Sequence, residues 1–272
     1  MFWRLLSWTA YRRAVPGLRR DRLPRRPPSL RRPQAARDVV RDRRVPAQAP
    51  APRPPCVGYH GDMDLFRPVG LEELRLIYQA EMRAFPPRLP DQPIFYPVTN
   101  EGYAIQIARD WNTKSGTKAG FVTRFSIADD YASKFERRVV GAKEHEELWV
   151  PADELGALNA HIEGRIEVTR AFFGDEYRGH VPDARGKDAR EQLVALAETP
   201  PHSGFDVISE MTADDVAVFL NFFFWQQADF SSDGIDRSAR DELLGKLRAV
   251  WNKDAHGGVD LGTTTSTAPS SG

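Results

Sequence analysis

Apolar residues recur at helical spacing in three stretches of the central part of the chain. They predict helices within residues 70–82, over 101–111 after Asn100 as N-cap, and over 151–162, where Pro151 fits the first turn. The residues expected on the buried faces are Leu71, Leu74, Ile77, Tyr78, Ala104, Ile107, Ala108, Trp111, Leu155, Leu158 and Ile162.

A strict alternation of apolar and polar residues over 121–127 predicts a strand with Phe121, Thr123, Phe125 and Ile127 on one face. Shorter strand-like runs cover 64–69, 94–98, 137–141, 147–150 and 164–173. Four prolines within 85–93 bar a helix there, so this segment is expected to be an extended loop. Strands and helices do not alternate strictly, which favours an α+β domain over 63–174 with a small mixed or antiparallel sheet and packed helices.

A helical appendage is expected after a polar linker at 175–187. It spans 188–253, and a flexible tail follows at 254–272. Its three helices are predicted near 188–198, 212–228 and 236–252. Thr212, with Asp215 three residues on, has the arrangement that starts a helix. The aromatic face of the second helix fits packing onto the other helices and the central domain, or a partner-binding surface.

The formal charge of zero conceals two oppositely charged parts. Residues 1–62 hold 15 Arg and no Lys against 4 Asp, a charge of +11. The remainder, with 23 basic and 34 acidic side chains, carries −11. Ten prolines among the first 55 residues and this excess of charge predict a disordered Arg/Pro-rich segment.

Three interpretations of this basic segment stay open. It fits an organelle transit peptide, because it is Arg-rich and acid-poor with an apolar start. It also fits a tail that binds nucleic acid or anionic lipid through its charge. Finally, Arg without Lys is typical of a GC-rich reading frame begun too far upstream, with Met63 as the start of the folded part. No function is assigned to it, and no nucleic-acid partner is expected unless the segment is real.

Several kinds of chemistry find no support in the sequence. The single cysteine, Cys56, excludes an internal disulfide and a cysteine-based zinc site, and it suits a reducing, cytoplasmic location. The longest apolar run, 216–225, is far below the ~18 residues of a membrane span. Dinucleotide, P-loop and nucleophile-elbow signatures are missing, and the scattered histidines give no reason to expect a metal.

The segment "KEHEELWVPADEL", residues 143–155, concentrates candidate chemistry. If 147–150 is a strand, Glu147 and Trp149 share one face while Leu148 and Val150 face the core. A carboxylate beside an aromatic plate can hold a ribose hydroxyl or stabilise a developing cation while a flat ring stacks on the indole. The alternative is a solvated glutamate at a strand edge and a tryptophan that merely packs.

The stretch from "LFRPVGLEELRLI" through "IARDWNT" to "ELWVPADEL" and "RAFFG" resembles a small family of uncharacterised bacterial proteins. Its members carry the label "ADP-ribosylation/crystallin J1". The resemblance covers about residues 64–174. The label echoes the ADP-ribosyl-hydrolases, which are larger, all-helical and use clustered Asp and Glu around magnesium, features that this sequence lacks. The ADP-ribosyltransferase fold, a small split sheet that binds NAD, is the better analogy.

The analogy implies a role for three residues that follow one another on strands. Arg67 on the first strand would pair with a phosphate, Thr123 on a middle strand would orient a hydroxyl, and Glu147 on a later strand would stabilise the oxocarbenium-like transition state. Trp149, Tyr96 and His145 would line the NAD site. The sequence departs from the family in having no Ser-Thr-Ser run and, in place of a separated E-x-E, only Glu144, Glu146 and Glu147 in one run.

Two functions from different classes follow. The first is an NAD-using, ADP-ribosyltransferase-like enzyme, in active or degenerate form, that takes NAD as substrate, needs no metal and modifies a protein or other acceptor. The second is a non-catalytic interaction module, for example of immunity type, whose acidic balance meets a basic partner.

Overall fold

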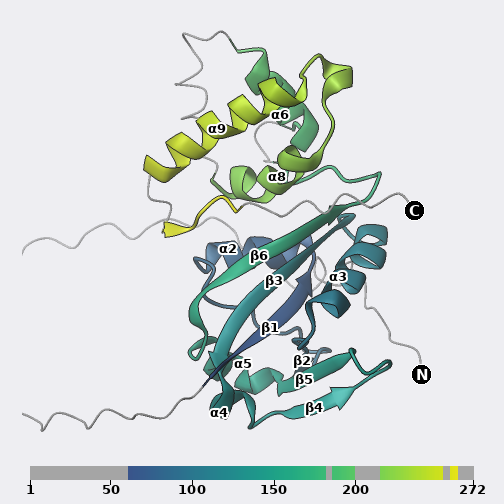
Figure 1. Cartoon of the computed structure of the whole chain (residues 1–272), viewed down its shortest axis with the longest axis vertical. Helices are drawn as coiled ribbons and strands as arrows, with labels where there is room; N and C mark the ends of the chain where they lie inside the picture. The colour runs from purple at the N-terminus through teal and green to yellow at the C-terminus, as the bar shows by residue number, and fades with distance from the viewer. Residues whose placement is uncertain (1–60, 182–185, 200–214, 254–257, 263–272) are drawn as a thin grey trace, which may run out of the picture. The chain divides into compact units, whose positions relative to one another are not determined.

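The computed structural model describes residues 61–181, 186–199, 215–253 and 258–262. These residues belong to one compact unit. The predicted basic segment up to residue 60 and the predicted cap at Thr212 lie outside the described residues. The described part contains seven α-helices and two three-stranded antiparallel sheets, so the predicted α+β class is confirmed (Figure 1).

The first sheet has the order β1-β3-β6 and all its pairings are antiparallel. Its strands are β1 (Asp62–Val69), β3 (Ala119–Ala128) and β6 (Glu163–Phe173). Phe121 and Phe125 on one face of β3 belong to the main hydrophobic core together with α2 (Leu71–Gln79). The opposite face is covered as well, because Val122 packs in a second cluster with α3 (Glu101–Asp110).

The second sheet has the order β2-β5-β4 and is joined to the first through one residue. Its strands are β2 (Ile94–Phe95), β4 (Glu136–Val139) and β5 (Glu146–Pro151). Val98 forms antiparallel bridges both with Phe66 of β1 and with Glu147 of β5. Residues far apart in the sequence therefore meet where the two sheets join.

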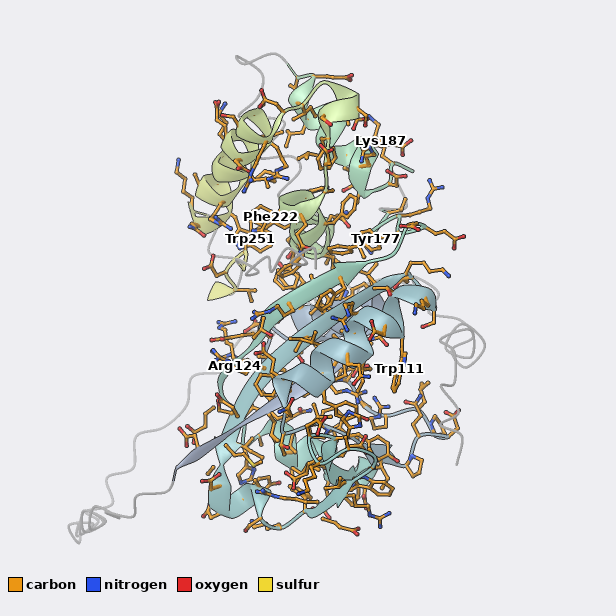
Figure 2. The ribbon with its side chains drawn as sticks, turned by 45° about the vertical axis from the view of Figure 1, so that its right-hand side comes forward. Trp111, Arg124, Tyr177, Lys187, Phe222 and Trp251 are labelled. Atoms are coloured by element: carbon orange, nitrogen blue, oxygen red, sulfur yellow. The ribbon has the colours of Figure 1, made fainter. Side chains whose placement is uncertain are left out.

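Helix α3 begins as predicted, because the Asn100 side chain accepts a hydrogen bond from the backbone N–H of Tyr103 at 3.0 Å. It lies so close to β3 that a Cβ on Gly120 would stand 2.0 Å from the carbonyl oxygen of Ala108, which requires glycine at that position. One expectation for this helix is wrong. Trp111 is not buried but 38% exposed at the C-terminal end (Figure 2).

The segment after β5 differs from the prediction at its first residue. Pro151 ends the strand, where it pairs with Ile94, instead of opening a helix. A 3₁₀ turn, Ala152–Glu154, separates it from the short helix α5 (Leu155–Asn159). A further turn of helix, α4 (Asp129–Ala132), follows β3. Leu155 and Leu158 are buried as predicted.

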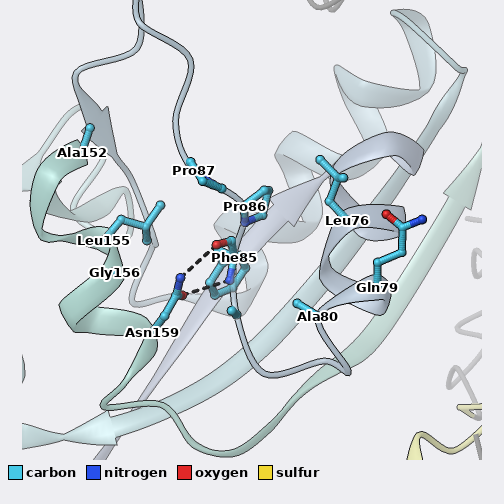
Figure 3. A pocket seen from close by; sticks show the side chains of 11 residues that line it. Leu76, Gln79, Ala80, Phe85, Pro86, Pro87, Ala152, Leu155, Gly156 and Asn159 are labelled. Carbon is cyan, nitrogen blue, oxygen red and sulfur yellow. Dashed lines mark hydrogen bonds between the residues drawn. The ribbon is translucent and has the colours of Figure 1, made fainter. Parts of the chain in front are cut away.

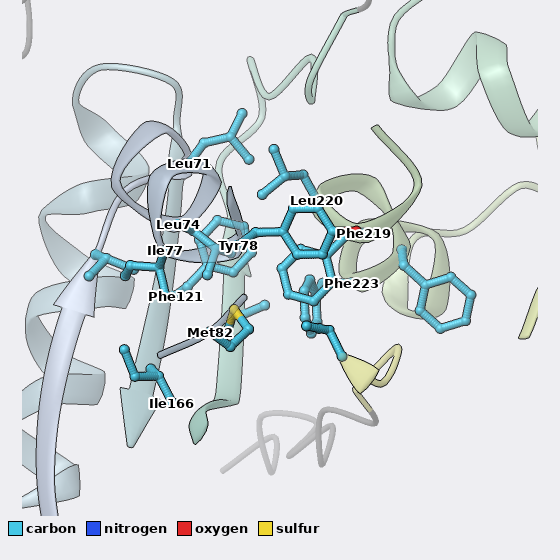
Figure 4. Close-up of a cluster of buried hydrophobic side chains, with 14 of the residues drawn as sticks. Leu71, Leu74, Ile77, Tyr78, Met82, Phe121, Ile166, Phe219, Leu220 and Phe223 are labelled. Carbon is cyan, nitrogen blue, oxygen red and sulfur yellow. The ribbon is translucent and has the colours of Figure 1, made fainter. Parts of the chain in front are cut away.

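Three helices of the C-terminal region are described: α6 (Ala189–Ala197), α8 (Asp215–Gln227) and α9 (Arg237–Lys253). Helix α8 is buried on several sides, since Phe222 and Trp225 are inaccessible to solvent as well as Leu220. The Tyr78 ring of α2 stacks on Phe219 with 4.3 Å between centroids, and its hydroxyl donates to Asp215 at 3.0 Å (Figure 4). The aromatic residues of α8 therefore share the core of the sheet domain.

Part of the segment expected to be a flexible tail is packed. In 258–262, Val259 and Leu261 are buried, and the Trp251 indole N–H donates to the Val259 carbonyl oxygen at 2.7 Å. These two residues anchor the segment to α9, although a pair of alternating apolar residues is too short to predict an ordered element.

Candidate functional site

The six residues singled out in the sequence lie on or next to four strands around the junction of the sheets. Arg67 and Thr123 are directly opposite each other on β1 and β3. Tyr96 follows β2, and His145 precedes β5. The remaining two, Glu147 and Trp149, are on β5. The structure therefore brings together residues that are up to 82 positions apart in the chain.

Glu147 is a buried carboxylate, only 1% exposed, and not a solvated residue of a strand edge. Its oxygens accept hydrogen bonds from the Trp149 indole N–H at 3.1 Å and from the Tyr103 hydroxyl at 3.4 Å. Burial raises the pKa of Glu147, while these two donors and the charges of Arg67 and His145 act in the opposite direction. The pKa of Glu147 therefore depends on the hydrogen-bond donors and charged groups beside it.

Aromatic rings surround this carboxylate. Tyr96 stands edge-on to Trp149 with 5.1 Å between centroids, and Tyr103 stacks on His145 at 4.2 Å. Burial and the adjacent Glu147 raise the pKa of Tyr103 to about 12, so its phenol stays a hydrogen-bond donor. The guanidinium of Arg138 on β4 lies 3.7 Å from the centre of the Trp149 ring. A ligand ring that stacks on this face of the indole must displace Arg138.

Arg67 uses its donors inside the protein. Its Nε and Nη2 donate to the two carboxylate oxygens of Glu73 at 3.2 and 3.4 Å, and its Nη1 donates to the Tyr96 carbonyl oxygen at 3.2 Å. The guanidinium also lies 5.0 Å from the centre of the Phe95 ring. This paired and largely buried side chain ties β1 to α2 and to the segment after β2.

A second guanidinium, which the sequence gave no reason to choose, reaches the same carboxylate. Arg88 comes from the proline-rich loop, and its Nη1 lies 3.8 Å from the Glu73 oxygen that Arg67 Nε contacts. Its Nη2 donates to Gln92 at 2.6 Å. Burial, and next the charge of Arg67, lower the pKa of Arg88. We refer to Arg67, Glu73, Arg88 and Glu147 as the charged cluster.

The Thr123 hydroxyl lies inside the protein and is not presented at a surface where a ligand could contact it. The side chain is inaccessible to solvent, and the hydroxyl donates to the Arg67 carbonyl oxygen at 2.9 Å. Any effect of Thr123 on a ligand passes through the position of β1, since Arg67 and Thr123 form a cross-strand pair.

Three residues of the site are absent from the set chosen in the sequence: Glu73, Arg88 and Tyr103. Glu73 and Tyr103 lie in helices whose apolar spacing was recognised, but their partners lie on strands far along the chain. Arg88 lies in the proline-rich loop "FPPRLPDQP", where no periodic pattern indicates which side chains turn inward.

A separate groove with a volume of about 490 Å³ lies between the end of α2 and α5 (Figure 3). Its lining includes Leu76, Phe85, Pro86 and Leu155 together with Asn159, which exchanges two hydrogen bonds with the backbone of Phe85, each 2.9 Å long. Since no lining residue is ionisable, this groove offers no acid, base or phosphate ligand.

The described ranges lack two features of other protein classes. They contain no group of three or more His, Cys, Asp or Glu side chains that could hold a metal ion. Of the helices described, none has the length and apolarity needed to cross a membrane. Comparison of the chain with family models, with curated proteins and with solved structures finds no match.

Proposed function

We propose that residues 63–174 are an NAD-binding domain of ADP-ribosyltransferase type, working in a reducing cytoplasm. The observation that carries the proposal is Glu147, a buried carboxylate between the indole N–H of Trp149 and the Tyr103 hydroxyl. Two small antiparallel sheets, joined through Val98 where it bridges to Glu147, agree with the split sheet that the resemblance implies.

The reaction would break the bond between the anomeric carbon of the ribose and the nicotinamide nitrogen. The bonding electrons leave with nicotinamide, and positive charge develops on the ribose. An ionised Glu147 at this carbon stabilises that charge strongly because it is shielded from water. An acceptor nucleophile then bonds to the anomeric carbon and loses its proton. Tyr96 and Trp149 are the aromatic rings beside this carboxylate that can contact the nicotinamide.

Release of nicotinamide from labelled NAD by the full chain tests this proposal. Glu147→Gln should lower the rate about 10²–10³-fold, the usual effect of removing one stabilising group at a developing charge. Glu146→Gln, one position away and more exposed, is the control and should leave the rate unchanged. Equal release by Glu147→Gln and the unmodified protein would contradict the assignment.

A non-catalytic interaction module, of the immunity type, is the second candidate. It is supported by the internal pairing of Arg67 and Thr123 and by β4, an edge strand on which every side chain is exposed. Residues 63–272 carry a net charge of −11, which would suit a basic partner. Absence of both nicotinamide release and an NAD-induced rise in melting temperature favours this candidate, whereas a rise without release indicates a binding-only relative of the enzymes.

A further inference from the structure

Two buried guanidinium groups share one carboxylate in this protein. The side chains of Arg67 and Arg88 are each 12% exposed, and both lie against the same oxygen of Glu73. Bringing two cations together away from water is unfavourable unless anions balance them. The acidic groups nearby therefore decide how well the second guanidinium is balanced.

The other acidic groups compensate the second cation poorly. Asp91 acts on Arg88, but it is exposed and screened by solvent. Glu147 acts on Arg67, but its oxygens are engaged by Trp149 and Tyr103. Among the described residues, Glu73 is thus the one carboxylate that forms an ion pair with either guanidinium.

The two arginines differ in what they have left to donate. Arg67 places Nε, Nη1 and Nη2 on Glu73 and on the Tyr96 carbonyl oxygen. For Arg88, Nε is buried without a hydrogen-bond partner in the part of the chain that the structure describes. A buried donor without a partner is uncommon in folded proteins and has an energetic cost that a ligand oxygen can remove.

We propose that Arg88 is the principal phosphate-binding residue of the site and takes the diphosphate of the dinucleotide, while Arg67 and Glu73 hold it in place. The identity of the ligand rests on the proposed function; the place for a further anion rests on the sharing of Glu73 by two guanidinium groups and on the unpartnered Nε of Arg88. Phosphate oxygens suit the site, because the Nε of this planar guanidinium can donate to one oxygen while Nη2 exchanges Gln92 for a second. Tyr96, on which the charges of both Arg88 and Glu147 act, connects this position with the carboxylate.

Binding of inorganic pyrophosphate, NAD and nicotinamide riboside to the full chain tests the inference by titration calorimetry. Arg88→Gln should weaken pyrophosphate and NAD binding about 10–100-fold, the equivalent of one charge-assisted hydrogen-bonded contact. The affinity for nicotinamide riboside, which carries no phosphate, should not change. Arg75→Gln is the control, since Arg75 already pairs with Glu72 on the surface of α2. The arginines of the basic segment are present in every variant, so they contribute equally to the binding that is measured for each.

Arg88→Lys, which keeps the charge and loses the planar fork, extends the test if Arg88→Gln does not fold, and it should weaken pyrophosphate binding several-fold. Unchanged binding in either folded variant, or no pyrophosphate binding by the unmodified protein, overturns the inference even if nicotinamide is released. Arg88-dependent pyrophosphate binding without nicotinamide release supports the inference and removes the enzymatic proposal.

Discussion

Two groups of buried polar side chains in this protein differ in how well their members satisfy one another. The neutral cluster, formed by Asn221, Gln192 and the backbone of His180, is closed. Asn221 accepts from the His180 N–H at 2.8 Å and donates to the His180 carbonyl and to Gln192. Gln192 donates to the His180 and Lys187 carbonyl oxygens. The charged cluster instead has two cations on one carboxylate, a donor without a partner and a glutamate with a raised pKa.

Pairing is complete in the neutral cluster, which serves the fold, and incomplete in the charged cluster, for which we propose a ligand. Complete pairing among neutral groups fixes α6 and α8 together and leaves nothing to offer a further molecule. Incomplete pairing among ions costs stability, and such imbalance is typical of functional sites. Four variants test this distinction, beginning with the largest expected effect.

Glu73→Ala should be the most destabilising of the four. It removes the anion that Arg67 and Arg88 share, and loss of one partner from a buried ion pair costs about 3–5 kcal/mol. Denaturant unfolding measures the change. Glu72→Ala, which removes the surface pair with Arg75, is the matched control and should cost less than about 1 kcal/mol. Similar costs for the two variants would show that the cluster is solvated.

Asn221→Leu should destabilise the protein by about 1–3 kcal/mol, because the His180 N–H and Gln192 lose a buried partner. Unfolding experiments give the size of the effect, and calorimetric titration shows whether ligand binding changes. The folded variant should bind NAD with unchanged affinity. Weaker NAD binding by folded Asn221→Leu would remove the functional difference between the two clusters.

Glu147→Gln should stabilise the protein by an amount that grows with pH. A raised pKa means that the folded state favours the protonated acid, so the unmodified protein loses stability as pH rises from the ordinary glutamate range through the raised pKa. The amide cannot ionise and avoids this loss. Melting temperatures of the two proteins should coincide near pH 4 and separate at neutral pH, and a constant difference at all pH values would contradict a raised pKa of Glu147.

Arg138→Ala should have the smallest effect on stability, because Arg138 is exposed on the edge strand β4 and pairs with the exposed Glu136. Its melting temperature should stay the same. Removal of the guanidinium uncovers one face of Trp149, so quenching of tryptophan fluorescence by acrylamide should increase. Arg137→Ala, at the neighbouring position, should leave quenching unchanged. An equal increase in both variants would mean that Arg138 does not cover the indole.

Local patterns in the sequence predict most of the elements but few of the contacts of the charged cluster. Alternation over 121–127 and helical spacing after Asn100 depend on neighbouring residues, and both were confirmed. The shared face of Glu147 and Trp149 was also confirmed, because it needs only the two-residue period of a strand. Pairing of Arg88 with Glu73 depends instead on the path of a proline-rich loop, which no period specifies.

Two of the predictions are wrong at the end of an element. Pro151 was assigned to a helix from its local preference, whereas pairing with Ile94 extends the strand through it. Trp111 continues an apolar period by one more turn, but α3 ends before it and its ring stays at the surface. In both cases long-range contacts or the end of an element override a local preference.

Hydrogen–deuterium exchange of the full chain with and without NAD tests the central claim most directly, because it reports on both clusters in one experiment. With NAD, exchange should slow in peptides that cover residues 86–98 and 145–150 and should not change in α6 or α8. Protection confined to the basic N-terminal segment or to the C-terminal helices, or no protection at all, would contradict the central claim.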